Sequence, residues 1–382
     1  MEPLPLQGIR ILDLSRLLPG PYLTQLLADL GAEVIKVESP LVGDYSRLAP
    51  PEMGLGGLFE SVNRGKKSLA LNYRNPRGRE LFLGLCKHAD VVLEGFRPGV
   101  VDKFGIGYQA VSKVNPGIVY CSLSGYGGQG PYRDRAGHDL NYLAVGGALG
   151  LNAPAGGGRP LPFGVPVADL SGAMLAAIAI LGALVGRERG QNGRYLDVAL
   201  LDGVLSWVTP LAGGAYFSGL EVKAGSHPLL GGLACFNVYE TSDGKFLSLA
   251  ALEPGFWGDF CKAAGRLDWI ERQFEPAMHD ELDRLFRSRT REEWLALLEG
   301  LDACVEPVTS FEEMLFHPQV QALGHVRLEA GRPVGMNSPF RFTPREHSGA
   351  PRLGAHTAEI LQEIGIPDQE IRDLTDRKVI AC

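Results

Sequence analysis

The chain has 382 residues, of which 45% are hydrophobic and 21% are charged, a balance typical of a folded globular protein rather than a disordered or fibrous one. Because single hydrophobic cores usually stop growing at about 250–300 residues, we expect two domains. The net charge of −7 provides no general basic field, so nucleic acid is not expected as a partner, and an anionic ligand must be bound by local basic clusters.

Three further features indicate the compartment. No stretch approaches the roughly 18–20 uninterrupted apolar residues of a membrane span, and the opening MEPLP lacks the basic-then-apolar order of a secretory signal. The 6 cysteines are scattered, without a CxxC pair or zinc-ligand spacing. We therefore expect a cytoplasmic protein with reduced thiols, no metal site and no membrane partner.

The first half of the chain alternates short apolar runs with helical patterns. Strands are expected at 9–14, 33–38, 68–72, 90–94 and 118–123, and helices at 21–30 and 77–88. This alternation is typical of an α/β fold with a doubly wound, Rossmann-like parallel sheet.

The second half of the chain begins with helical patterns and then changes to a hairpin followed by amphipathic helices. Helices are expected at 139–149 and 169–185, a strand at 195–200, a hairpin at 236–251 with an Asp-Gly turn, and helices at 257–264, 278–287 and 291–298. We therefore expect a large domain over 1–200, a linker at 201–224, and a smaller α+β domain over 225–325. Residues 326–382 would form a return strap and C-terminal helix that complete the large domain.

A glycine-rich motif at 125–130 matches GxGxxG and follows a predicted strand, as a dinucleotide-binding fingerprint does. The next residues, PYRDRAG, are polar and broken, whereas that fingerprint requires an apolar-faced helix whose N-terminus binds the pyrophosphate. The motif therefore favours a flexible loop near an active site over a nicotinamide or flavin site. No nucleophile elbow, zinc-protease or Walker motif occurs in the sequence.

Three titratable residues stand at predicted helix starts. His138, in GHDLNY at 137–142, would lie at the positive end of a helix dipole, which favours a neutral imidazole able to act as a base. Asp169 begins a nearly uncharged helix, where a dry pocket would raise its pKa. Glu253 stands between an apolar strand and an aromatic helix start. For each residue, a structural role at the helix start is the alternative.

Basic residues follow several predicted strands, at the edge where doubly wound sheets bind ligands. They lie in the segments 63–68, 71–74 and 94–103. Coenzyme A carries a pyrophosphate and a 3′-phosphate that need such cations, and an adenine that needs an apolar or aromatic wall. Solvated surface charge is the alternative for any one of these residues.

Together these segments resemble the class III CoA-transferase family, which contains carnitine and formate CoA-transferases and α-methylacyl-CoA racemases. The resemblance covers nearly the whole chain. It rests on GIRILDLSR (8–16), PGPY (19–22), LADLGAEVIKVE (27–38), NRGKKS (63–68), EGFRPG (94–99), SGYG (124–127) and LGAHT (353–357).

The resemblance implies an activity as well as a fold. Family transferases use an aspartate that becomes a mixed anhydride and then an aspartyl-CoA thioester, and Asp169 matches its position. GHDLNY and LEPGFW (252–257) are similar to racemase motifs, so the resemblance favours an α-methylacyl-CoA racemase, with a CoA-transferase as the alternative. It implies that His138 and Asp169 transfer protons on opposite faces of the α-carbon, while Glu253 orients His138.

The same resemblance implies how the substrate is bound. Backbone N–H groups near Asp169 or in the His138 loop would stabilise an enolate-like oxyanion. No metal or separate cofactor is implied, because coenzyme A is part of the substrate. The implied CoA-binding residues are Leu71, Asn72, Tyr73, Arg74, Gly95, Phe96, Arg97, Lys103, Gly137, Asp139, Asn141 and Tyr142.

One departure from the family concerns a phosphate contact. Many relatives have an arginine just after the VIKVE strand, where this chain has Ser39 and Pro40, so the contact is expected to be weaker or to come from Arg47 or a partner chain. Family members form interlocked homodimers, and by analogy we expect one here. The sequence does not identify the acyl group.

Overall fold

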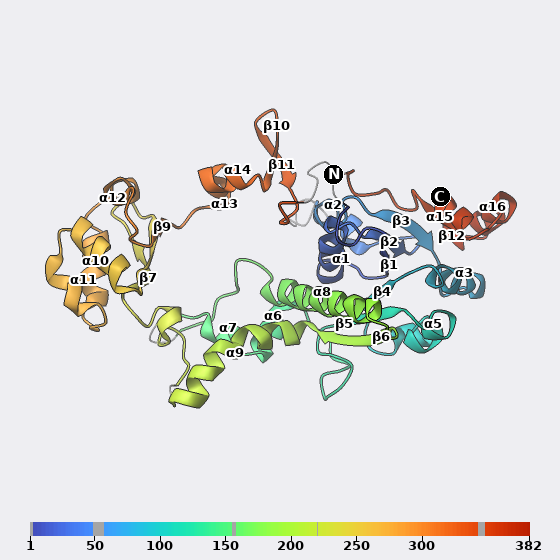
Figure 1. Ribbon diagram of the computed structural model, residues 1–382, viewed down its shortest axis with the longest axis horizontal. Coiled ribbons are helices and arrows are strands. Elements are labelled where there is room, and N and C mark those ends of the chain that lie inside the picture. The colour runs from blue at the N-terminus through green and yellow to red at the C-terminus, as the bar shows by residue number, and fades with distance from the viewer. Residues whose placement is uncertain (1–2, 49–56, 155–157, 220, 343–347) are drawn as a thin grey trace. The chain divides into compact units, whose positions relative to one another are not determined.

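The computed structural model describes residues 3–48, 57–154, 158–219, 221–342 and 348–382, and the chain in it divides into two compact units (Figure 1). Unit 1 comprises Met1–Gly146, Val165–Trp207 and Leu323–Cys382. Unit 2 comprises Gly147–Gly164 and Val208–Ala322.

Unit 1 is built on a 7-stranded sheet in the order β12-β3-β2-β1-β4-β5-β6. Its strands are β1 (Arg10–Asp13), β2 (Glu33–Glu38), β3 (Lys67–Leu71), β4 (Val91–Glu94), β5 (Val119–Ser124), β6 (Arg194–Ala199) and β12 (Ile380–Ala381). β1 to β6 pair in parallel, while β12 pairs antiparallel with β3. This confirms the predicted α/β fold with a doubly wound sheet, whose strand order reverses between β1 and β4.

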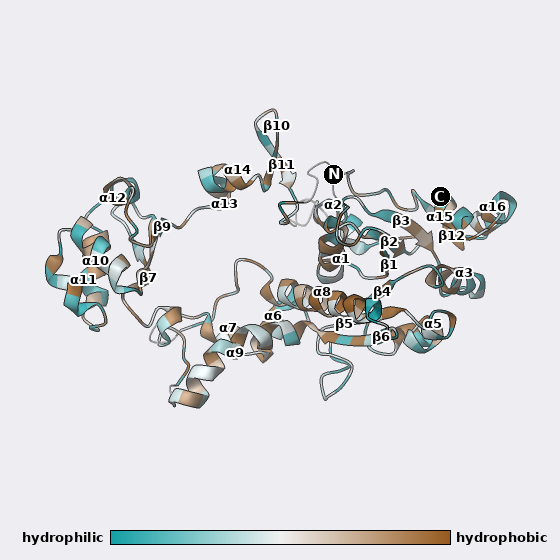
Figure 2. Ribbon diagram, viewed as in Figure 1, coloured by the Kyte–Doolittle hydropathy of each residue, from teal (hydrophilic) through white to brown (hydrophobic). Residues whose placement is uncertain are grey.

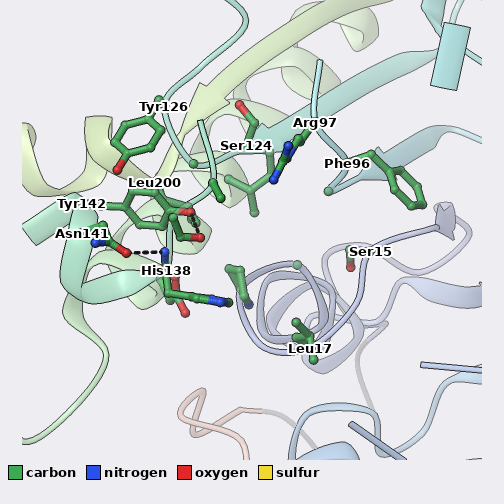
Figure 3. Close-up of a pocket in the computed structure, with 18 of the residues that line it drawn as sticks. Ser15, Leu17, Phe96, Arg97, Ser124, Tyr126, His138, Asn141, Tyr142 and Leu200 are labelled. Carbon is green, nitrogen blue, oxygen red and sulfur yellow. Dashed lines mark hydrogen bonds between the residues drawn. The ribbon is translucent and has the colours of Figure 1, made fainter. Parts of the chain in front are cut away.

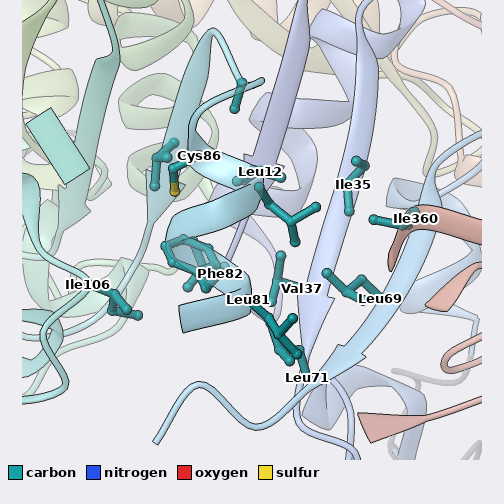
Figure 4. Packing of buried hydrophobic residues seen from close by; sticks show 14 of the residues in the cluster. Leu12, Ile35, Val37, Leu69, Leu71, Leu81, Phe82, Cys86, Ile106 and Ile360 are labelled. Carbon is teal, nitrogen blue, oxygen red and sulfur yellow. The ribbon is translucent and has the colours of Figure 1, made fainter. Parts of the chain in front are cut away.

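Helices cover both faces of this sheet. They are α1 (Pro19–Asp29), α2 (Leu58–Val62), α3 (Pro76–Cys86), α4 (Val100–Lys103), α5 (Tyr108–Val114), α6 (Asp139–Val145), α8 (Val167–Glu188), α15 (Thr357–Glu363) and α16 (Asp368–Asp376). Leu12, Val37, Leu69, Phe82 and Ile360 pack in one buried cluster on the α3 side (Figure 4). Because both faces are covered, β4 and β5 are buried along their whole length.

The helix α8 lies against α1, β5 and β6, and its residues are mostly apolar (Figure 2). By length and composition it could cross a membrane, and half of its most apolar stretch is buried. Its apolar residues do not form the uninterrupted run expected of a span, because Asp169 and Ser171 interrupt them near the start of the helix. A packed core helix passes the same test, so this finding does not indicate a span. The cytoplasmic location stays a prediction.

Unit 2 contains a 3-stranded antiparallel sheet, β7 (Phe236–Glu240), β8 (Phe246–Ala250) and β9 (Val305–Pro307), in the order β7-β8-β9. The predicted Asp-Gly turn joins β7 to β8, with Gly244 in the left-handed conformation at a φ of 71°. Its helices are α7 (Ala148–Leu151), α10 (Pro254–Ala263), α11 (Met278–Phe286), α12 (Arg291–Leu298) and α13 (Phe311–Phe316). Trp257, Trp269 and Trp294 are fully buried in the core of this unit.

Several connections differ from the sequence-based expectations. The helix expected at 139–149 is two helices, because the chain turns at Gly147, which has a φ of 83°. The segment expected as a linker at 201–224 contains α9 (Leu200–Ser218). The return strap expected over 326–382 begins with a hairpin of β10 (Val326–Glu329) and β11 (Arg332–Met336), which follows α14 (Pro318–Leu323). The helices α15 and α16 and the strand β12 then rejoin the large sheet.

Candidate active site

Two cavities open where the parallel strands of unit 1 end. The first, which we call the His138 pocket, has a volume of about 480 Å³ and is lined by segments that follow β1, β4 and β5 and by the starts of α6 and α8. The second, which we call the Arg74 pocket, has a volume of about 300 Å³ and is lined by segments that follow β1, β2 and β3. Both lie at the edge of the sheet where doubly wound folds bind ligands.

His138 and Asp169 both line the His138 pocket, although 31 positions separate them in the sequence. His138 is the residue just before α6, and its backbone N–H donates to Asn141 Oδ1 at 3.0 Å, which closes the loop over the helix start. Its side chain is exposed. Figure 3 shows Tyr126 and Tyr142 together beside His138, with Phe96 and Arg97 across the pocket.

Asp169 lies in the first turn of α8 and is partly buried. Burial raises the pKa of its carboxyl to about 7, and the nearby charge of Asp139 acts in the same direction. The carboxyl is therefore present in both protonation states near neutral pH. A group of this kind can both accept and donate a proton.

Asp139 is not among the residues that line either pocket, although the resemblance placed it in the CoA site. Its Oδ1 accepts the backbone N–H of Ala168 at 2.6 Å and that of Asp169 at 3.2 Å. Asp139 therefore caps α8, not the helix that it begins, and joins the segments that carry His138 and Asp169. These two N–H groups are therefore engaged by Asp139.

Glu253 stands immediately before α10 in unit 2, where its backbone carbonyl accepts the N–H of Trp257 at 3.1 Å. Pro254 follows it at the first helical position, which fixes the entry of the chain into the helix. His138 belongs to unit 1, so the role of Glu253 as its partner stays a prediction.

The other predicted CoA-binding residues divide between the two pockets. Gly95, Phe96, Arg97, Gly137, Asn141 and Tyr142 line the His138 pocket. Leu71, Asn72, Tyr73, Arg74 and Phe96 line the Arg74 pocket. Lys103 ends α4 and, like Asp139, lines neither pocket.

Sequence reasoning missed the residue that links the two pockets. Arg16 lines both of them, as does Phe96, and the Arg16 guanidinium lies 4.8 Å from the centre of the Phe96 ring and 4.9 Å from that of Tyr45. Its position just after β1, at the carboxyl edge of the sheet, is the signal that could have found it. Lys378, which lines the Arg74 pocket, follows α16 and carries no comparable signal.

Arg47, expected as a substitute for the absent arginine, is engaged elsewhere. Its guanidinium donates to both carboxylate oxygens of Glu38 at 2.8 Å and to the carbonyl of Pro351 at 3.0 Å, and it lies 3.6 Å from the Phe59 ring centre. It lines neither pocket. The structure therefore does not bear out Arg47 as a phosphate contact, because its donors already have partners.

A buried ionic network lies beneath the loop that follows β1. Lys36 Nζ is 2.9 Å from Asp44 Oδ2 and donates to the carbonyl of Ser15 at 3.0 Å. Asp13 accepts from the backbone N–H of Ser15 at 2.8 Å and from Thr24 Oγ1 at 2.6 Å. Burial opposes ionisation of Asp13, yet the charges of Lys36 and Lys66 keep its pKa below the usual value. The network fixes the backbone that carries Arg16.

The turn after β4 is supported in a similar way. Glu94 is almost fully buried, and its Oε2 accepts the backbone N–H of Phe96 at 2.7 Å. Burial raises the pKa of Glu94 to about 7, although its hydrogen bonds to Ser122 and Phe96 oppose that shift. The Glu94 carboxyl group thus fixes the backbone of the segment 95–97, which lines the His138 pocket.

Known proteins resemble this chain along nearly its full length. The chain matches the model of CoA-transferase family III over residues 6–357. It is 33% identical to alpha-methylacyl-CoA racemase of Homo sapiens, over 98% of this chain and 97% of that protein. It is 34% identical to succinyl-CoA:glutarate CoA-transferase of Mus musculus, over 94% of this chain and 86% of that protein.

A solved structure agrees with these similarities. The crystal structure of a CAIB/BAIF family protein from Brucella suis is 32% identical, with a TM-score of 0.81 over 95% of this chain and 100% of that one. The racemase and the transferase are about equally similar to this chain, so similarity alone does not choose between their reactions. The chain belongs to CoA-transferase family III and is an enzyme of this family of transferases and racemases.

Proposed function

We propose that this enzyme is an α-methylacyl-CoA racemase, which interconverts (R)- and (S)-2-methylacyl-CoA thioesters by moving one proton. The observation that carries the proposal is that His138 and Asp169, from two different helix starts, line one cavity. Inversion of one carbon requires a base on the face that loses the proton and an acid on the opposite face. A single group would only exchange the proton on one face.

The two pockets support an elongated thioester substrate. Arg16 and Phe96 line both, so one ligand could pass from the Arg74 pocket to the His138 pocket along their shared wall. The cations and aromatic rings of the Arg74 pocket suit the nucleotide end of coenzyme A. The acyl carbon would then lie in the His138 pocket, beside the two acid–base groups.

The reaction would proceed in two proton transfers. One of the two groups removes the α-proton, and the electron pair of the broken C–H bond moves toward the thioester carbonyl to give an enolate-like oxyanion. Backbone N–H groups at the start of α6 would stabilise that oxyanion. The other group then donates a proton to the opposite face, which restores the carbonyl and inverts the stereocentre.

The raised pKa of Asp169 favours proton transfer over nucleophilic attack. A carboxyl whose pKa is raised to about 7 can serve as acid in one direction and as base in the other at neutral pH. A carboxylate nucleophile works better fully ionised.

Incubation of the enzyme with one epimer of a 2-methylacyl-CoA in heavy water tests the proposal. We expect deuterium at the α-carbon together with appearance of the opposite epimer, measured by mass spectrometry and by chiral separation of the acids after thioester hydrolysis. An α-hydrogen that stays unexchanged would contradict the racemase proposal. Exchange of the α-hydrogen without formation of the opposite epimer would show that only one group transfers the proton, and would contradict the two-base mechanism.

A CoA-transferase is the second candidate, because Asp169 lines the pocket and several transferases are as similar to this chain as the racemases are. A transferase would carry its acyl group and then CoA on Asp169. Incubation with an acyl-CoA and hydroxylamine would convert Asp169 to a hydroxamate, visible as a mass change in its peptide. A new thioester formed on addition of a free acid would favour this candidate, and absence of both would oppose it.

We also propose that the active form is a homodimer. Three aromatic side chains of α9 are exposed in the single chain, Trp207 at 56%, Tyr216 at 85% and Phe217 at 93%. Large exposed apolar groups gathered on one element often mark an interaction surface. Light scattering coupled to size-exclusion chromatography should give twice the chain mass, and a monomeric mass would contradict this part of the proposal.

A further inference from the structure

We propose that Lys378, in the C-terminal segment, binds the 3′-phosphate of coenzyme A and so makes the enzyme selective for the 3′-phosphorylated form. The inference rests on the proposed use of the two pockets by a CoA thioester. It concerns the cation that takes the place of the arginine expected near Ser39.

The C-terminal segment is held beside the Arg74 pocket by backbone contacts. β12 pairs with β3 so that Ile380 lies opposite Leu71, and the N–H of Asn72 donates to the carbonyl of Val379 at 2.8 Å. Lys378 has a φ of 54°, the left-handed conformation that turns the chain out of α16 and into β12. This turn brings Lys378 to the wall that Asn72 and Arg74 also form.

The charges of the Arg74 pocket leave Lys378 available for a ligand. Two carboxylates line this pocket, but Glu38 is bound by Arg47 and Ser68, and Asp44 is bound by Lys36. In the part of the chain that the structure describes, no ion pair joins Lys378 to a carboxylate. Lys378 is exposed and lines the pocket, so an anion bound by its ammonium would gain a partner without displacing one.

The positions of Arg16 and Lys378 indicate which phosphate of coenzyme A each of them would bind. Arg16 lies at the junction of the two pockets, and the diphosphate of coenzyme A lies between its adenosine and its pantetheine arm, so Arg16 suits the diphosphate. Lys378 and Arg74 line the Arg74 pocket and not the His138 pocket. The phosphate that remains at the adenosine end is the one on the ribose 3′-oxygen.

Two other residues that could have bound this phosphate, Ser39 and Arg47, are excluded. Ser39 also lines the Arg74 pocket, but its hydroxyl is a neutral group. Arg47 is held by Glu38 and Pro351 and lines neither pocket. The cation absent from position 39 is therefore supplied from the far end of the chain, 339 positions later.

Isothermal titration calorimetry with coenzyme A and 3′-dephospho-coenzyme A tests the assignment on the full-length enzyme. We expect the wild type to bind coenzyme A about tenfold more tightly, the scale of one charge-assisted contact at a partly exposed site. Lys378→Gln should lose most of that preference while its affinity for 3′-dephospho-coenzyme A is unchanged. Lys378→Arg should keep it, and added salt should reduce it in the wild type.

The neighbouring Arg377→Gln is a matched control, because Arg377 is exposed, carries the same charge and does not line the pocket. Its preference for coenzyme A should equal that of the wild type. Equal binding of the two ligands by the wild type, or equal weakening of both by Lys378→Gln, would overturn the assignment. A wild type that binds neither ligand would overturn the proposed function itself, and this inference with it.

Discussion

The two units bury different kinds of side chain. The buried groups of unit 1 hold the loops of the binding pockets, whereas those of unit 2 form a hydrophobic core. Toward the carboxyl edge of the sheet in unit 1, Asp13, Lys36, Asp44 and Glu94 are buried charged or ionisable groups in or just after β1, β2 and β4. The core of unit 2 is aromatic, with Trp257, Trp269 and Trp294 at its centre. Burial of ionic groups stabilises a protein little in net terms, so such a network is better understood as a device that fixes loop geometry.

Substitution of the two acid–base residues should have the largest effect and should leave the fold of unit 1 intact. His138→Ala and Asp169→Ala are each expected to slow α-proton exchange by about 10²–10⁴-fold, each from a different epimer. Deuterium incorporation from each pure epimer measures this. His88→Ala, an exposed histidine outside the pocket, is the control. Equal and minor losses for both epimers would contradict two opposed bases.

Breaking the buried ion pair of unit 1 should cost stability. Lys36→Met leaves the Asp44 carboxylate buried without its ammonium partner, and we expect a loss of about 3–5 kcal/mol in the free energy of unfolding. Urea unfolding followed by circular dichroism measures it. The double variant Lys36→Met/Asp44→Asn should recover part of the loss. A single variant as stable as the wild type would show that the network carries no such constraint.

The same pair gives the wild type a pH dependence. Burial opposes ionisation of Asp44, but the charge of Lys36 and the hydrogen bonds from Lys36 and from the backbone of Ser46 and Leu17 together lower the pKa of the carboxyl. Its contribution to stability is therefore present above the usual carboxyl pKa of about 4 and is lost as the pH falls through the lowered value. In Lys36→Met this acid-side loss should be smaller, as urea unfolding at several pH values would show.

A conservative change in the aromatic core of unit 2 should have a smaller effect. Trp294→Phe reduces the ring contacts with Phe286 and removes the hydrogen bond from the indole N–H to the Phe286 carbonyl at 2.9 Å. We expect a loss of about 1–3 kcal/mol from the cavity and the unpaired carbonyl. Thermal unfolding measures it, with the exposed Phe274→Leu as the control. Unchanged CoA affinity in Trp294→Phe would sharpen the contrast between the two units.

The smallest expected effect concerns how Asp139 tunes Asp169. The exchange rate of the epimer whose proton Asp169 removes should rise with pH through about 7, as its carboxyl ionises. Asp139→Asn removes the neighbouring negative charge, so that rise should move to lower pH by about one unit or less. Rate profiles from pH 5 to 9 measure the shift. A shift to higher pH would mean that the cap of α8, and not the charge, dominates.

Local sequence patterns predicted much of the fold, because strands and tight turns depend mainly on residues that are close together in the sequence. The apolar runs that become β1, β2, β4 and β5 and the Asp-Gly turn between β7 and β8 lie where the sequence predicts them. The helix α9 was missed, since glycines and Pro210 interrupt an otherwise apolar run. Packing can stabilise a helix whose intrinsic propensity is weak, and propensity alone does not reveal this.

The sequence by itself determined the family and the doubly wound sheet. It also identified His138, Asp169 and Glu253 as candidate site residues. This was possible because strand periodicity and motifs depend on residues that are neighbours in the sequence. Only the tertiary structure decided that Asp139 caps α8, that Arg47 is held by Glu38, and that Arg16 joins the two pockets. It also brought Lys378 to the wall of the Arg74 pocket through the antiparallel pairing of β12 with β3. Contacts of this kind depend on which chain segments pack together, and no local spacing encodes that.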